Sequence, residues 1–142
     1  MPTSGTAAFG TLLKLGDAGS PETFTTVAEI TDLDGVDIKL DTDDATSHDS
    51  NFWEESIATI LSGGEPTYKV NWLPTNATHN ETTGVLAVIM NRQKRNWKIV
   101  LPNTVKTFSF AAIVTNFKPG IPLKGKLTAE FKLKISGPIT IA

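Results

Sequence analysis

The chain has 142 residues, a formal net charge of −2 and no cysteine. This length fits one domain, residues 1–142, within the usual ~100–200 residues. The missing thiols exclude disulfides and cysteine nucleophiles. The first nine residues lack the basic and apolar regions of a secretory signal, and no run reaches the ~18 apolar residues of a membrane span. We therefore expect a protein that is made in a cytoplasm and spans no membrane.

The charges are divided between the two halves of the chain. Residues 1–65 carry thirteen acidic residues and two lysines, a formal charge of −11, whereas residues 66–142 carry eleven basic and two acidic residues, a formal charge of +9. Chance and one acidic loop would explain this split. Patches that attract other copies of the chain would also explain it, since complementary charges guide association and set register. A nucleic-acid binder would more often be basic overall.

Several strands are predicted in the first part of the chain. Residues 10–15 form the first, and residues 24–30, rich in Thr, Val and Ile, form the second. Asp34-Gly35 is a turn signal that leads into a further strand at residues 36–40. These elements indicate antiparallel pairing between neighbours in sequence.

Two segments carry no core pattern. Residues 1–8 form a featureless N-terminal arm. Residues 41–51 are polar and acidic with no apolar residue except Ala45, so we expect an extended, exposed and mobile loop. The apolar residues between positions 53 and 61 then show helical spacing, but the run is short, so a helical turn and a strand both stay open.

One helix is expected in the middle of the chain. Thr78-His-Asn-Glu81 matches a capping box, in which the Thr hydroxyl and the Glu side chain each satisfy a free backbone amide. Basic residues beyond the apolar stripe suit the negative end of the helix dipole. The stripe consists of Val85, Leu86, Ile89 and Met90. His79 lies inside the box, so we expect it on the surface.

The clearest alternation lies near the C-terminus. Residues 126–135 alternate strictly between apolar and polar side chains, which places one set on a core face. Residues 107–117 are rich in β-branched and aromatic residues, and the prolines and glycine of residues 118–123 fit a turn between them. Shorter strands are predicted at residues 68–72 and 97–101. The sequence thus predicts a mainly β (α+β) single domain, an antiparallel sandwich or barrel-like fold with one flanking helix.

Candidate chemistry is scarce. Ser47-His48-Asp49 contains the letters of a hydrolase triad, but consecutive loop residues cannot converge on one proton path. The acidic run at residues 32–37 lacks the spacing and closing glutamate of an EF-hand, and a solvated polar loop is favoured over weak ion binding. Residues 92–98 fit a helix end before a core tryptophan better than a single-strand nucleic-acid surface. We expect no catalytic, cofactor or metal site.

The order and spacing of several segments resemble the major tail tube protein of long-tailed, siphovirus-type bacteriophages. These segments are AEITDLDGVDI at residues 28–38, WEESI at residues 53–57, YKVNWLP at residues 68–74 and FKLKISG at residues 131–137. The resemblance spans residues 24–137 and includes no catalytic signature.

The resemblance implies a fold related to the tubes of contractile tails and type VI secretion. Subunits of that family form hexameric rings, and the rings stack into a hollow tube that carries DNA. It implies contacts with a tape measure protein and with terminator or tip proteins, a place in the virion tail after assembly in the host cytoplasm, and no enzymatic activity. It also implies that the polar loop 41–51 and the arms 1–8 and 138–142 make contacts between rings.

Together with the charge split, the resemblance suggests that an acidic surface of one ring meets a basic surface of the next. Head-to-tail contacts of this kind generate rings or filaments. The resemblance implies an acidic lumen, so lysines of the last strand are expected outside or between subunits. The expected contact residues are Asp41, Asp43, Asp44, His48, Asp49, Lys124, Lys126, Lys132 and Lys134.

The main alternative is a carbohydrate- or protein-binding β-sandwich module, and a small enzyme comes third. A binding module would expose an aromatic platform. Trp53, Trp72 and Trp97 are instead predicted at core-like positions, which favours the tube subunit.

Overall fold

A computed structural model describes residues 5, 7–19 and 21–142. It confirms a single, mainly β domain with antiparallel sheets and one helix. The elements in chain order are β1 (Leu12–Gly16), β2 (Phe24–Thr26), β3 (Ile30–Leu33), β4 (Lys39–Asp44), β5 (Ser56–Ser62), β6 (Thr67–Asn71), α1 (Val85–Met90), β7 (Lys94–Val100), a 3₁₀ turn (Pro102–Thr104), β8 (Thr107–Gly120), β9 (Thr128–Ile135) and β10 (Thr140–Ile141).

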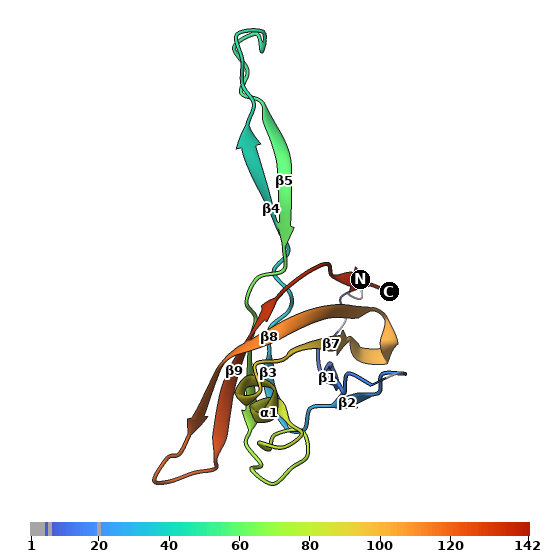
Figure 1. The fold of residues 1–142 in the computed structure, drawn as a ribbon, viewed down its shortest axis with the longest axis vertical. Coiled ribbons are helices and arrows are strands. Elements are labelled where there is room, and N and C mark those ends of the chain that lie inside the picture. The colour runs from blue at the N-terminus through green and yellow to red at the C-terminus, as the bar shows by residue number, and fades with distance from the viewer. Residues whose placement is uncertain (1–4, 6, 20) are drawn as a thin grey trace.

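Eight strands form one sheet in the order β2-β1-β7-β8-β9-β6-β3, with β10 paired to β8. The sheet curls, and the chain passes between its two edge strands through Val27, whose N–H donates to the Leu13 carbonyl at 2.8 Å. α1 packs against β8, and the long strands β8 and β9 run side by side across the body (Figure 1). The apolar faces of the strands therefore enclose one core.

The core is built from alternate side chains of the central strands. Trp97, Tyr68 and Phe131 are fully buried, and the Phe131 ring lies 5.5 Å from Tyr68 and 6.4 Å from Trp97, centroid to centroid. Along β9, Phe131 and Leu133 are buried while the intervening lysine is exposed, which confirms the predicted alternation. Each such side chain contributes about 1.5–3 kcal/mol when buried. The predicted C-terminal hairpin is also confirmed, as β8 paired with β9.

The first part of the chain differs from the prediction in pairing. The expected strand 24–30 is divided into β2 and β3, because the chain turns at Glu29, where φ is 57°. Asp34-Gly35 does not close a hairpin, since β3 pairs with β6 rather than with the strand that follows it. That strand starts at Lys39 instead of residue 36 and pairs with β5.

β4 and β5 form a separate two-stranded hairpin that projects from the body (Figure 1). The structure thus settles residues 56–62 as a strand rather than a helical turn. Residues 41–44, predicted as loop, belong to β4, and the irregular tip is confined to residues 45–55. Every residue of both strands is exposed, so no in-and-out alternation marked them as a pair in the sequence.

The helix exists, but the capping box does not start it. α1 begins at Val85, seven residues after Thr78, and its N-cap is Gly84 with no side-chain cap. The Thr78 hydroxyl instead accepts from the Ala28 N–H at 3.1 Å and donates to Asn76 Oδ1 at 2.6 Å. The buried positions of α1 are Val85, Ala87 and Val88, whereas Met90, predicted in the apolar stripe, is 70% exposed.

The two predicted arms differ in what the structure describes of them. Residues 1–4 and 6 of the N-terminal arm lie outside the described residues. In the C-terminal segment, Thr140 pairs with Ser109, and the backbones of Ala142 and Thr107 exchange two hydrogen bonds. Residues 138–142 therefore include a short strand held to β8.

Candidate functional site

The projecting hairpin exposes large apolar side chains along its length. Leu40, Ile57, Ile60 and Leu61 are each more than half exposed. A two-stranded hairpin alone is marginally stable in water, so its large exposed apolar side chains indicate a surface that binds a partner. The hairpin is therefore the first candidate for a functional surface.

The hairpin tip, residues 45–55, carries an exposed aromatic pair. Phe52 is fully exposed and Trp53 is 76% exposed, so the predicted core position of Trp53 is wrong. Phe52 also has a φ of 67°, a left-handed conformation that is strained for a residue with a Cβ and is typical of functional sites. Sequence reasoning missed this pair, because its exposure depends on the pairing of β4 with β5 in a hairpin that projects from the body.

The hairpin tip is held by its own hydrogen bonds. The Ser47 N–H donates to Ser50 Oγ at 3.0 Å, the Ser50 N–H donates to the Ser47 carbonyl at 3.1 Å, and the Trp53 N–H donates to the Ser50 carbonyl at 3.0 Å. Ser50 is 6% exposed although it lies far from the core. His48 lies exposed beside this network, and nothing here assembles a hydrolase triad. These hydrogen bonds fold the backbone of the tip that carries the aromatic pair.

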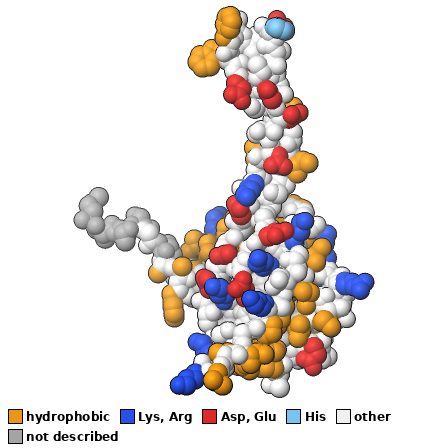
Figure 2. All heavy atoms as spheres, turned by 90° about the vertical axis from the view of Figure 1, so that its left-hand side faces the viewer, with side chains coloured by type: hydrophobic (Ala, Val, Ile, Leu, Met, Phe, Trp, Pro, Cys, Tyr) orange, Lys and Arg blue, Asp and Glu red, His pale blue; other side chains and the backbone are white. Residues whose placement is uncertain are grey.

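Acidic side chains run along the same hairpin (Figure 2). Asp41, Asp43 and Asp44 lie on β4, and Asp49 lies at the hairpin tip. Thr46, through its hydroxyl and its backbone N–H, lowers the pKa of Asp44 and keeps this carboxylate charged. Within the described residues, the hairpin's only ion pair is the exposed one between Lys39 and Asp37 at its base, 3.3 Å long. The acidic charge of the hairpin is thus almost unneutralised.

The structure separates the lysines that the sequence grouped with these acids. Lys124 and Lys126 lie in the turn between β8 and β9, whereas Lys132 and Lys134 lie on the outer face of β9. The hairpin and this turn stand at opposite ends of the molecule (Figure 1). Acidic and basic candidates are therefore not brought together within one copy.

The outer face of the main sheet is basic. On strands β1, β6, β7 and β9, lysines occupy positions that alternate with buried side chains. They are Lys14, Lys69, Lys94, Lys98, Lys132 and Lys134. Glu130 is the acidic residue among them, paired in register with Lys69. Alternation in the sequence had indicated this face for β6, β7 and β9, where Lys69, Lys98, Lys132 and Lys134 alternate with apolar residues.

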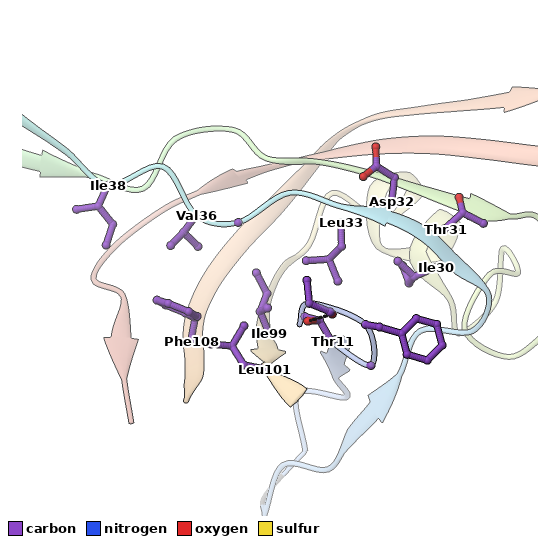
Figure 3. Close-up of a pocket in the computed structure, with 14 residues that line it drawn as sticks. Thr11, Ile30, Thr31, Asp32, Leu33, Val36, Ile38, Ile99, Leu101 and Phe108 are labelled. Carbon is purple, nitrogen blue, oxygen red and sulfur yellow. Dashed lines mark hydrogen bonds between the residues drawn. The ribbon is translucent and has the colours of Figure 1, made fainter. Parts of the chain in front are cut away.

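An apolar pocket lies beside the root of the hairpin (Figure 3). Leu33 and Val36 line one side of it, and Ile99 and Phe108 line the other. Asp32 is the titratable residue of its lining. Among the described residues no cluster of His, Asp and Glu could hold a metal ion. The pocket offers packing surface rather than an acid–base pair.

His79 is a structural residue, not the surface residue that the capping box predicted. It is 2% exposed; its Nδ1 accepts from the Leu73 N–H at 3.0 Å and its Nε2 donates to the Ala28 carbonyl at 2.7 Å. Burial lowers the pKa of His79, so the ring is neutral near pH 7.

In the part of the chain that the structure describes, no helix is long and apolar enough to cross a membrane.

Comparison with known proteins gives one family and a set of similar folds. A family model described as lambda phage tail tube protein matches residues 10–142. The tail of an empty gene transfer agent particle, solved with C6 symmetry, matches with a TM-score of 0.78 at 15% identity, covering 97% of this chain and 99% of that chain. No curated protein matches this sequence.

Injection systems supply two further similar structures. The extended sheath/tube terminator of an extracellular contractile injection system has a TM-score of 0.73 at 15% identity, covering 99% of this chain and 98% of that chain. The anti-feeding prophage baseplate has a TM-score of 0.70 at 13% identity, covering 100% and 97%. At these identities the likeness shows a shared fold.

Proposed function

The chain belongs to the lambda phage tail tube protein family, and on that premise we propose that its copies form hexameric rings that stack into the tube through which phage DNA passes into the host. The observation that carries this proposal is the β4–β5 hairpin, whose strands are exposed at every residue. A structural part of the virion tail needs no active site. The neutral, buried His79 and the isolated Asp32 of the pocket are consistent with a non-enzymatic role.

We assign most of the stabilisation of the hairpin to contacts with other copies of the chain. Burying a large apolar side chain contributes about 1.5–3 kcal/mol. Several such side chains together offset the loss of translational and rotational freedom on association, about 4–15 kcal/mol. Those of the hairpin are Leu40, Phe52, Trp53, Ile57, Ile60 and Leu61. We therefore assign the hairpin to contacts between rings.

Sixfold symmetry and partner proteins rest on the similar structures. The gene transfer agent tail was solved with C6 symmetry, which supports a ring of six for this chain. Chains with this fold occur in the structure of a sheath/tube terminator and in that of a tube terminating cap, which supports end proteins that stack on the tube. A tape measure protein inside the tube and assembly in the host cytoplasm complete the proposal.

Contact residues follow from the same scheme. The hairpin set comprises the carboxylates Asp41, Asp43, Asp44 and Asp49 together with His48, and the basic set comprises Lys124, Lys126, Lys132 and Lys134. The polar segment 41–51, which includes the end of β4 and the first part of the tip, and the segments 1–8 and 138–142 are the parts assigned to contacts between rings. The exposed Phe52 and Trp53 would also suit the alternative, a carbohydrate-binding module, because sugars stack on aromatic rings.

Electron microscopy of the purified full chain at rising concentration tests the proposal. Rings with sixfold end views and stacked tubes are the expected result. A protein that stays monomeric at high concentration and binds immobilised glycans would overturn the tube and favour the carbohydrate-binding module.

A further inference from the structure

The turn between β8 and β9, residues 121–127, is an exposed surface of mixed character. Leu123 is fully exposed and Ile121 is 72% exposed. Lys124 and Lys126 stand beside them, and neither forms an ion pair with any described residue. Gly125 has a φ of 114°, which only glycine adopts readily, so the turn has a defined shape. A cationic turn with apolar side chains at its apex suits an acidic, apolar partner.

The hairpin tip, residues 45–55, has the complementary character. Phe52 and Trp53 supply exposed rings, and Asp49, Glu54 and Glu55 supply negative charge around them. Its internal hydrogen bonds fix the backbone before contact, which lowers the entropy lost on binding. Lysine beside an aromatic ring also adds a cation–π attraction. Charge and apolar surface therefore match between the hairpin tip and the β8–β9 turn.

The two surfaces cannot meet within one copy, because they lie at opposite ends of the long axis (Figure 1). Copies stacked in the same orientation along that axis bring the hairpin tip of one copy toward the β8–β9 turn of another. Such a contact joins two different surfaces, so it does not close on itself and propagates as a filament.

Other receiving surfaces on the molecule fit the hairpin tip less well. Asp32, Asp34 and Asp37 lie on the strand and segment that border the apolar pocket beside the hairpin root, so this region would repel an acidic tip, although the Asp32 side chain points away from the apolar lining (Figure 3). The basic face around Lys132 and Lys134 has the right charge, but the large apolar side chains of β9 point into the core. The β8–β9 turn combines both properties.

We propose that the hairpin tip of a subunit in one ring docks on the β8–β9 turn of a subunit in the next ring, with Phe52 and Trp53 packed against Ile121 and Leu123 and the glutamates of the tip facing Lys124 and Lys126. This inference rests on the proposed function, since it names the partner surface of the same hairpin.

Charge reversal in the full chain tests the contact. The critical concentration for tube formation is measured by sedimentation at low ionic strength. Lys124→Glu with Lys126→Glu should raise it at least about tenfold, because like charges then face each other. Glu54→Lys with Glu55→Lys should raise it similarly, and all four substitutions together should restore it to within about threefold of the unmodified chain.

A matched control carries the same change of charge elsewhere. Lys94→Glu with Lys106→Glu alters two exposed lysines outside the β8–β9 turn and should keep the critical concentration within about threefold of the unmodified value. Circular dichroism and thermal unfolding confirm that each variant is folded. Unchanged assembly after the turn reversal, or no rescue in the fourfold variant, overturns the contact. A turn reversal that weakens only DNA binding to intact tubes also overturns it and assigns the lysines to DNA.

Cross-linking gives a second readout, because the chain contains no cysteine. Tubes of the His48→Cys, Ile121→Cys variant treated with a short bis-maleimide should yield a ladder of covalent multimers. Tubes that carry His48→Cys with Lys94→Cys should stay monomeric on denaturing gels. Intact tubes that yield no ladder contradict the docking of the hairpin tip on the β8–β9 turn, but they do not contradict the proposed tube. An unmodified chain that never assembles overturns the proposed function and the docking with it.

Discussion

His79 is held by two hydrogen bonds that require one tautomer. Its Nδ1 accepts from Leu73 and its Nε2 donates to Ala28, so a second proton would remove an acceptor inside the protein. The ring thereby links the segment before α1 to the connection between β2 and β3 and to the residues that follow β6. Local sequence could not indicate this role, because Ala28 lies fifty-one residues away.

We expect stability to depend on pH through His79. Burial lowers the pKa of His79 in the folded protein below its ordinary 6.5, so the unfolded chain takes up the proton first as pH falls. The free energy of unfolding should thus be unaffected by this group above about pH 6.5 and should decline below it. Urea unfolding at pH 7 and pH 5 measures this decline. His79→Gln should flatten that slope and cost about 1–3 kcal/mol, from lost buried hydrogen bonds.

The second histidine provides the control for this prediction. His48 is exposed at the hairpin tip, so His48→Gln should keep both the stability and the pH slope of the unmodified protein. Equal slopes in the His79→Gln and His48→Gln variants would show that His79 is not the titrating group.

Truncation of Trp97 and truncation of Trp53 should have very different effects on the free energy of unfolding. Trp97 is fully buried against Phe131, so Trp97→Ala should lower the free energy of unfolding by about 3–5 kcal/mol. Trp53 is 76% exposed, so Trp53→Ala should change it by less than about 0.5 kcal/mol. Urea unfolding below the assembly concentration measures both. A large loss of stability in Trp53→Ala would place Trp53 in the core, as its sequence position suggested.

At the scale of elements, regular alternation made the β8–β9 hairpin predictable, and its absence hid the β4–β5 hairpin. A strand with one buried face repeats with period two, and β9 does so. β4 and β5 are exposed on both faces, so nothing in residues 39–62 separates core from solvent. A strand without a buried face gives no period-two signal, so the pairing of β4 with β5 could not be found from alternation in the sequence.

The start of α1 depends on a close approach that only glycine permits. A Cβ at Gly84 would lie 2.5 Å from backbone atoms of Thr78, His79 and Asn80. Gly84→Ala should therefore lower the free energy of unfolding by about 1–3 kcal/mol, because the loop before α1 must move. At Gly35 a Cβ meets nothing within 4 Å, so Gly35→Ala should be neutral within about 0.5 kcal/mol. Thermal unfolding compares the two, and equal melting temperatures would refute the close approach.

On the scale of the whole molecule, the structure shows where the charged residues of the two halves of the chain lie. The acidic half includes the projecting hairpin, and the basic half includes the outer sheet face and the β8–β9 turn (Figure 2). The sequence alone divided the charges at residue 65, but it could not show that the hairpin is almost purely acidic while the body carries charges of both signs (Figure 2), because that depends on which strands pair. The fold class and the exposure of the acidic residues 41–49 were predictable; the aromatic pair at the hairpin tip was not, since exposure there depends on the same pairing.

The role of the hairpin in assembly can be isolated from folding. The Asp37 N–H donates to the Gly63 carbonyl at 3.0 Å, so the two ends of the hairpin already meet at the body. Residues 38–62 can therefore be replaced by an Asn-Gly turn without stretching the chain. Because both strands lie outside the core, the shortened protein should keep the far-UV and near-UV circular dichroism of a folded body.

The most direct measurement compares the full chain and this shortened chain by electron microscopy and light scattering at the same concentrations. We expect rings and tubes from the full chain and a folded monomer from the shortened chain, because the hairpin supplies the contact between rings. Tubes formed by the shortened chain would contradict the assigned role of the hairpin, and a full chain that never exceeds the mass of a monomer would contradict the tube itself.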